Sequence, residues 1–129
     1  MLDHIGVPVS NYARSKAFYE RVLAPLGGGL VMEVTQEVTG SRAHGGFGRD
    51  GKPSFWISAN PIAPLSSIHV AFVAPTREAV DRFYEAALAA GATDNGPPGL
   101  RPHYHASYYA AFVLDLDGHN VEAVCHLSA

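Results

Sequence analysis

Hydrophobic positions divide the chain into two segments of similar design, each opened by a short apolar run, at residues 2–9 and at residues 67–74. Both runs are rich in Ile, Val and Phe, and such runs predict strands. Beyond each run the apolar residues recur at the spacing of a helix, as Phe18 and Val22 do in the first segment. The pattern therefore predicts a strand followed by a helix, twice along the chain.

Polar and helix-breaking residues mark the ends of both predicted helices. Ser10 or Asn11 can cap the first helix, and the hydroxyl group of Thr76 can cap the second. We expect the first helix to end at Pro25, ahead of a run of glycines. Gly91 stands where a left-handed residue commonly ends a helix, so the second helix is expected to stop there.

After each helix the hydrophobic period becomes that of strands. The predicted strands are residues 29–35, 42–48 and 53–59 in the first segment and residues 92–95, 107–115 and 119–127 in the second. Asp50-Gly51 and Asp117-Gly118 are strong signals for hairpin turns, and the Gly- and Pro-rich residues 96–102 predict a loop. Each segment thus has the order β-α-β-β-β.

The two segments are copies of one design. A shift of 65 residues, the separation of His4 and His69, places the tripeptide Phe-Tyr-Glu at 18–20 on an identical tripeptide at 83–85. Residues 60–66, with two prolines, predict the linker between the copies. We therefore predict a single α+β domain made of two paired modules. The predicted boundaries are 1–129 for the domain, about 1–60 for module 1 and about 67–127 for module 2.

The composition fits a compact folded domain and excludes several classes of protein. Hydrophobic residues make up 47% of the 129 residues and charged residues 16%, which is enough to build a core. The net charge of -3 argues against a nucleic-acid surface or a basic membrane patch, since both need clustered positive charge. No apolar run is long enough to span a bilayer, the N-terminus lacks the pattern of a secretory signal, and the single cysteine, Cys125, cannot form an internal disulfide. We expect a cytoplasmic protein with no nucleic-acid or membrane partner.

Histidine stands at the same position near the start of both segments. Alternate residues of a strand share a face, so His4 lies on the face of Gly6, and His69 lies on the face of Ala71. These small neighbours leave space that a bulky core residue would fill. In the last predicted strand the acidic residue is Glu122. These histidines and Glu122 are the first candidates for a functional site.

Four segments, residues 2–5, 18–19, 68–70 and 112–122, carry a resemblance to a known family. Together with the duplicated order they resemble the vicinal oxygen chelate superfamily, which holds glyoxalase I, extradiol dioxygenases, fosfomycin-resistance enzymes and bleomycin-binding proteins. The last segment is the most specific, because it places an Asp-x-Asp-Gly turn before an x-x-x-Glu strand. The resemblance implies that both modules form one curved eight-stranded mixed sheet around a concave site, and that the chain forms a homodimer.

The resemblance also implies a metal site and assigns its ligands to His4, His69 and Glu122. Two imidazoles and one carboxylate leave coordination positions open for water and substrate oxygens, and they suit Fe, Mn, Ni or Zn. His4 joins the other two ligands from its own chain or from a neighbouring one, and the sequence leaves both arrangements open. Glyoxalases use a further carboxylate from the first module. The 65-residue shift matches Glu122 with Ile57, so we expect the chain to depart from that four-ligand pattern.

A second group of candidates lies in the loop ahead of the strand at 107–115. Arg101 can clamp a substrate carboxylate, Tyr104 can contact the substrate, and His105 and Tyr108 can act as general acid or base. The alternative interpretation is a tyrosine-rich loop that covers the open end of the sheet.

Several further residues are predicted from strand alternation and neighbouring turns. Trp56 and His44, in strands of the first segment, are candidates for the wall of the substrate pocket. We expect His119 to face solvent or to bond with its own hairpin. Tyr109 and Cys125 are expected to be buried.

Two functions from different classes fit these residues. The first is a divalent-metal-dependent glyoxalase- or dioxygenase-like enzyme, a lyase, isomerase or dioxygenase whose small substrate chelates the ion through vicinal oxygens. The second is a non-catalytic protein that binds a small molecule or an antibiotic, as bleomycin-resistance proteins do. The aromatic residues Trp56, Tyr104 and Tyr108 and the acidic net charge are compatible with the second function.

Overall fold

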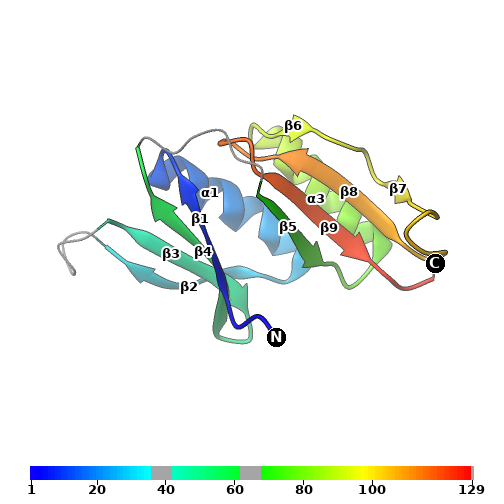
Figure 1. Cartoon of the computed structure of the whole chain (residues 1–129), viewed down its shortest axis with the longest axis horizontal. Coiled ribbons are helices and arrows are strands. Elements are labelled where there is room, and N and C mark those ends of the chain that lie inside the picture. The colour runs from blue at the N-terminus through cyan, green and yellow to red at the C-terminus, as the bar shows by residue number, and fades with distance from the viewer. Residues whose placement is uncertain (36–41, 62–67, 129) are drawn as a thin grey trace.

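The structure is a computed structural model that describes residues 1–35, 42–61 and 68–128 (Figure 1). Module 1 holds β1 (Ile5–Val9), α1 (Tyr12–Leu23), the 3-10 turn η1 (Ala24–Leu26), β2 (Gly29–Val34), β3 (His44–Arg49) and β4 (Lys52–Ala59). Module 2 holds β5 (His69–Val73), α3 (Arg77–Ala89), β6 (Thr93–Asp94), β7 (Gly99–Leu100), β8 (Tyr109–Leu114) and β9 (Asn120–Cys125). The order of elements confirms the predicted α+β class. The short strand β7 falls in the segment predicted as a loop, and most of the predicted linker, residues 62–66, lies outside the described residues.

Both modules have the same sheet topology. The strand orders are β1-β4-β3-β2 in module 1 and β5-β9-β8-β6 in module 2, where β7 also pairs with β8. In each module the first strand runs parallel to the last, with Gly6 opposite Trp56 and Ala71 opposite Glu122. Both helices lie against one face of the sheets and leave the other face open (Figure 1). No helix in the described part of the chain is long and apolar enough to cross a membrane.

The helix ends follow the predicted capping residues. Asn11 caps α1, because its side-chain oxygen accepts a hydrogen bond from the backbone N–H of Arg14 at 3.1 Å. The hydroxyl of Thr76 accepts from the backbone N–H of Ala79 at 3.0 Å and caps α3. Gly91 follows the end of α3 with a φ of 106°, a conformation that glycine adopts without strain.

The core lies between the helices and the covered face of the two sheets. Its largest buried side chains include Tyr19, Phe47, Ile57 and Phe83. In β9 the odd-numbered residues, such as Val121, join this core, so the even-numbered residues turn to the open face. The core therefore fixes which side chains the open face can present.

A buried polar network joins the end of β1 to the turn between β8 and β9. His119 is only 1% exposed, and its Nε2 lies 2.7 Å from the carbonyl oxygen of Pro8. Asp115 accepts hydrogen bonds from the backbone N–H groups of Asp117 and His119, both at 2.9 Å, and from the Tyr19 hydroxyl at 2.5 Å. Burial and the Asp115 carboxylate raise the pKa of Tyr19 well above its usual value.

This network rules out the first alternative for His119, that it faces solvent, and confirms the second, that it bonds with its own hairpin. The backbone N–H of His119 does bond with the hairpin, but its ring is buried against the other module. A contact between residues so far apart in the chain leaves no local pattern from which the burial can be predicted.

Candidate functional site

The open face of module 2 carries an imidazole and a carboxylate in direct contact. His69, at the start of β5, and Glu122, in the middle of β9, project from neighbouring parallel strands, and His69 Nε2 lies 2.9 Å from Glu122 Oε1. The Glu122 side chain is 2% exposed, whereas that of His69 is 48% exposed. The carboxylate is therefore held at the base of the face, and the imidazole is open to an incoming group.

Tyr108 contacts the second carboxylate oxygen of Glu122. Its hydroxyl donates a hydrogen bond to Glu122 Oε2. Burial and this bond to the carboxylate raise the pKa of Tyr108 to about 12. Tyr108 therefore keeps its proton at neutral pH and acts as a hydrogen-bond donor inside the site.

The spacing of His69 and Glu122 fits a shared first-row metal ion. Two neighbouring ligands of one ion lie about 3 Å apart when each bond is about 2.1 Å long. The 2.9 Å between Nε2 and Oε1 matches this separation, and both atoms are of the types that such ions prefer. The structure thus brings together two of the three predicted ligands.

His4 stands apart from this pair. It precedes β1, its side chain is 59% exposed, and its Nδ1 lies 2.7 Å from Asp3 Oδ2. Lys52 also bonds with Asp3, and this contact, together with His4, lowers the pKa of the Asp3 carboxyl. Among the described residues, no group of three or more His, Cys, Asp or Glu side chains is close enough to hold a metal ion.

The separation of His4 from the pair follows from the way the modules meet. The end of β1 contacts the turn before β9, and the start of β5, which carries His69, lies next to that turn. The start of β1, which directly follows His4, therefore lies at the opposite end of the junction between the modules. His4 and His69 do line one hollow of about 280 Å³ between the modules. His4 nevertheless makes its closest polar contact with Asp3 rather than with Glu122.

Two of the predicted substrate contacts lie on module 1 instead. Trp56 and His44 line a hollow of about 590 Å³ on the open face of that module, together with His4. His44 Nδ1 lies 2.7 Å from the hydroxyl oxygen of Ser58. The structure therefore separates these residues from the loop candidates of module 2.

The strand register corrects the predicted match between Glu122 and Ile57. Gly6 lies opposite Trp56, and its repeat partner Ala71 lies opposite Glu122, so Trp56 is the residue that matches Glu122. The sequence offset between β4 and β9 is one residue longer than the offset between β1 and β5, so a single offset cannot match both pairs of strands. Ile57 is fully buried in the core. Module 1 thus places an indole where module 2 places its carboxylate.

Arg101 is engaged with its own loop. Its two terminal nitrogens donate hydrogen bonds to the carbonyl oxygens of Gly99, at 2.9 Å, and of Pro97, at 2.8 Å. Its guanidinium also lies 5.4 Å from the centre of the Phe112 ring. The predicted carboxylate clamp is therefore, in this structure, the group that holds the loop against β8.

The remaining loop candidates form an aromatic cluster around Tyr108. The ring of Tyr108 lies 4.9 Å from that of Tyr104, 5.6 Å from that of His105 and 5.3 Å from that of His126. The backbone N–H of Ser107 donates to His105 Nδ1 at 3.0 Å, so the proton of the neutral ring is on Nε2, which donates to His126 Nδ1 at 2.7 Å.

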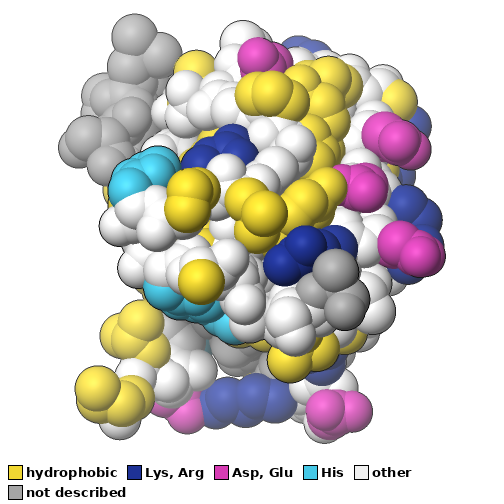
Figure 2. Space-filling view, turned by 90° about the vertical axis from the view of Figure 1, so that its right-hand side faces the viewer, with side chains coloured by type: hydrophobic (Ala, Val, Ile, Leu, Met, Phe, Trp, Pro, Cys, Tyr) yellow, Lys and Arg dark blue, Asp and Glu magenta, His cyan; other side chains and the backbone are white. Residues whose placement is uncertain are grey.

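His126, which directly follows β9, completes this cluster. The strand alternation that places it on the face of Glu122 is the one signal that pointed to it. Figure 2, which views the end of module 2, shows histidine side chains exposed beside hydrophobic ones.

The fold and the site define a protein of two βαβββ modules with a potential metal-binding pair on one open face. The family model of the Glyoxalase/Bleomycin resistance protein/Dioxygenase superfamily matches residues 1–123, and the chain belongs to this superfamily. No curated protein matches the sequence.

Solved structures support this placement. A glyoxalase/bleomycin resistance protein from Albidiferax ferrireducens T118 is 28% identical, with a TM-score of 0.75 over 95% of this chain and 96% of that chain. An E144Q mutant of glyoxalase I from Zea mays is 21% identical, with a TM-score of 0.74 over 95% of this chain and 46% of that chain. The fosfomycin resistance protein FosX from Listeria monocytogenes is 17% identical, with a TM-score of 0.67 over 97% of this chain and 90% of that chain. The last two likenesses show the fold alone.

Proposed function

We propose that this protein is a divalent-metal-dependent enzyme of the glyoxalase/dioxygenase type, a lyase, isomerase or dioxygenase that acts on a small substrate with vicinal oxygens. The observation that carries the proposal is the contact between His69 and the buried Glu122 at 2.9 Å. A buried carboxylate needs a positive partner, and a metal ion supplies one more strongly than a half-exposed imidazole.

The chain's own residues supply the remaining parts of the site. His69 and Glu122 would hold Fe, Mn, Ni or Zn, and such an ion, when bound, polarises substrate oxygens as a Lewis acid. Tyr108 orients Glu122 through its second oxygen and keeps a proton available at its hydroxyl. His105 is less suited to the role of base, because both of its ring nitrogens are already engaged.

The third ligand of the proposal is His4 from a second copy of the chain. In a single chain His4 is exposed and lies away from Glu122, with the exposed side chain of Leu2 nearby in the sequence. A homodimer that places this segment over the open face of a partner's module 2 would complete the ligand set and cover Leu2. The homodimer is therefore part of the proposed function.

The direct test is elemental analysis of freshly purified full-length protein beside two variants. We expect near-stoichiometric metal in the parent and none in His69→Ala. The matched control is His44→Ala, which removes a histidine from the open face of module 1 and is expected to leave the metal content unchanged. A parent that binds no ion, even after incubation with each candidate metal, contradicts the enzyme proposal.

A second candidate function is the binding of a small molecule or antibiotic without catalysis. It is favoured by the open hollow of about 590 Å³ on module 1, where Trp56 takes the position of the carboxylate. A ligand that binds only the folded protein raises its melting temperature. Stabilisation of metal-free protein together with a change in Trp56 fluorescence would support this function, and the loss of both effects in Trp56→Ala would locate the ligand.

A further inference from the structure

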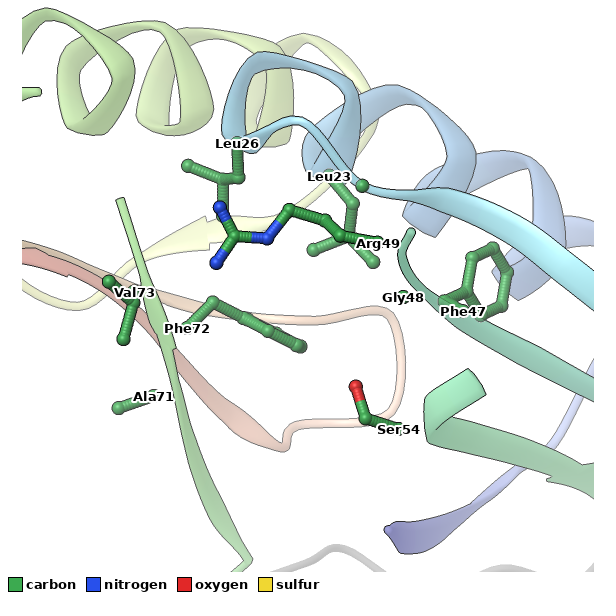
Figure 3. Close-up of a pocket in the computed structure, with 10 residues that line it drawn as sticks. Leu23, Leu26, Phe47, Gly48, Arg49, Ser54, Ala71, Phe72 and Val73 are labelled. Atoms are coloured by element: carbon green, nitrogen blue, oxygen red, sulfur yellow. The ribbon is translucent and has the colours of Figure 1, made fainter. Parts of the chain in front are cut away.

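A separate cavity lies where the end of α1 and the hairpin of β3 and β4 meet β5 (Figure 3). Its volume is about 190 Å³. Its apolar walls are Leu23, Leu26, Phe47, Phe72 and Val73. The polar side chains on its lining are those of Arg49 and Ser54. It adjoins the hollow between the modules but contains neither His69 nor Glu122.

Arg49 is an exposed residue that places a positive charge at the mouth of this cavity. Its guanidinium lies between Leu26 and Phe72, and the Ser54 hydroxyl points toward the same space (Figure 3). Within the part of the chain that the structure describes, the guanidinium of Arg49 forms no ion pair or hydrogen bond, while its backbone pairs with Lys52 in the hairpin of β3 and β4. An arginine held over an apolar cavity offers a forked donor that matches a carboxylate.

The internal repeat shows what module 2 places at the equivalent end of its matching strand, β8. Phe47 and Val113 are matched, because each lies opposite the matched residue of the last strand. The register shifts between Phe47 and Gly48, so beyond this point Arg49 and Asp115 correspond only as residues at the ends of matching strands, β3 and β8. The repeat therefore places a cation at one end of the junction between the modules and a carboxylate at the other.

The two ends differ in how completely the chain satisfies them. Asp115 is 7% exposed and receives hydrogen bonds from the Tyr19 hydroxyl and from two backbone N–H groups, while His119 closes the junction onto Pro8. Tyr84, the repeat partner of Tyr19, turns to Asp94 instead, at 3.1 Å. At the end with Asp115, groups of the chain itself satisfy the carboxylate. At the end with Arg49, no side chain among the described residues pairs with the guanidinium, and a cavity lies beside it.

The size and lining of the cavity indicate the ligand. An apolar protein cavity of about 150 Å³ accommodates benzene, so about 190 Å³ suits one ring with a small substituent. We propose that the junction cavity binds a small apolar monocarboxylate of the size of benzoate. The carboxylate would bond with Arg49 and Ser54, and the ring would lie between Leu26 and Phe72. This proposal does not depend on the metal site.

The test is calorimetric titration of the full chain with benzoate and with benzamide, its uncharged isostere. We expect benzoate to bind with a dissociation constant below about 10 mM and benzamide to bind at least about tenfold more weakly. Arg49→Gln is expected to weaken benzoate to the level of benzamide, and Ser54→Leu, which fills an exposed wall position, to abolish both. The matched control is Arg21→Gln, an exposed arginine on α1 away from the cavity, which should bind benzoate like the parent.

The fluorescence of Trp56 distinguishes binding in this cavity from binding on the open face of module 1. Trp56 is the one tryptophan of the sequence and lines that face, so binding in the junction cavity should leave its fluorescence unchanged. Equal binding of benzoate and benzamide, or full affinity in Arg49→Gln, overturns the proposal. So does the absence of binding by benzoate, cyclohexanecarboxylate and hexanoate alike.

Discussion

The open faces of the two modules share a backbone design but not a chemistry. In module 1 the opposed residues on β3 and β4 are Gly46 and Trp56, and in module 2 the matching pair on β8 and β9 is Phe112 and Glu122. The indole of Trp56 covers Gly46 so closely that an added Cβ would lie 2.9 Å from the ring. The position of the Glu122 carboxylate in module 2 is therefore taken by the Trp56 ring in module 1.

The two repeat histidines respond to this difference. His69 contacts Glu122, which is buried, whereas His4 bonds with Asp3, which is exposed and shared with Lys52. Within one chain, a histidine at this repeat position contacts a buried carboxylate only where one lies on the neighbouring strand. The comparison teaches that the carboxylate, more than the histidine, distinguishes the open face of module 2 from that of module 1.

The largest expected effect is the loss of metal when the carboxylate is removed from module 2. We expect Glu122→Gln to contain no metal, because an amide is a much poorer ligand than a carboxylate for these ions. Trp56→Gln changes the matched position of module 1 and should keep the metal content of the parent. Elemental analysis of both purified variants measures this, and equal metal in the two would remove the proposed asymmetry between the modules.

The next effect tests whether His4 acts across a dimer. His4→Ala and Glu122→Ala should each lack metal alone. In an equilibrated mixture about a quarter of the sites would combine an intact His4 with an intact Glu122, if the dimer is symmetric and exchanges freely. Metal content after mixing, unfolding and refolding the two variants together measures this. A mixture that stays free of metal would place His4 in the site of its own chain, whereas metal in His4→Ala alone would place His4 outside the site.

A smaller effect concerns the matched tyrosines of the two helices. Tyr19→Phe removes the donor to a buried carboxylate, and we expect a loss of about 1.5–3 kcal/mol in the free energy of unfolding. Tyr84→Phe removes a solvent-accessible bond to Asp94, so its stability should stay close to that of the parent. Urea unfolding of both variants measures the difference. Equal losses would show that the seal at Asp115 contributes no more than the surface contact.

Local patterns in the sequence predict most of the fold, because the features involved are local. Strand alternation sorts Cys125 and Glu122 onto opposite faces, and the side chain of Asn11 caps α1 as its type and position predict. The failures are non-local. The ring of His119 bonds with Pro8 across the junction, and the match of Trp56 with Glu122 depends on one extra residue in the loops of module 2.

The candidate site also has features that local patterns predict and features that depend on non-local contacts. The parity of their strands places His69 and Glu122 on one face, and the structure brings them into contact. Whether His4 joins them depends on how the modules and copies of the chain meet, which no periodicity records. Arg101 shows the same limit, since its engagement with Gly99 and Pro97 depends on the path of its loop.

The smallest expected effect is a pH dependence that only module 2 should show at its open face. The pKa of Tyr108 is raised to about 12 in the folded protein, above the value of about 10 for an unfolded tyrosine. The folded state therefore holds this proton between about pH 10 and pH 12 while the unfolded state releases it. The resulting stabilisation is fully present below about pH 10 and is lost as the pH rises through about 12.

Tyr108→Phe has no such proton, so its urea midpoint should fall less steeply over this range. Because Tyr19 also has a raised pKa, some dependence remains in the variant, and the difference between the two slopes is the quantity that tests Tyr108. Identical slopes would mean that the hydroxyl of Tyr108 is not held by Glu122 in solution, and His69 would then be the side chain in contact with that carboxylate.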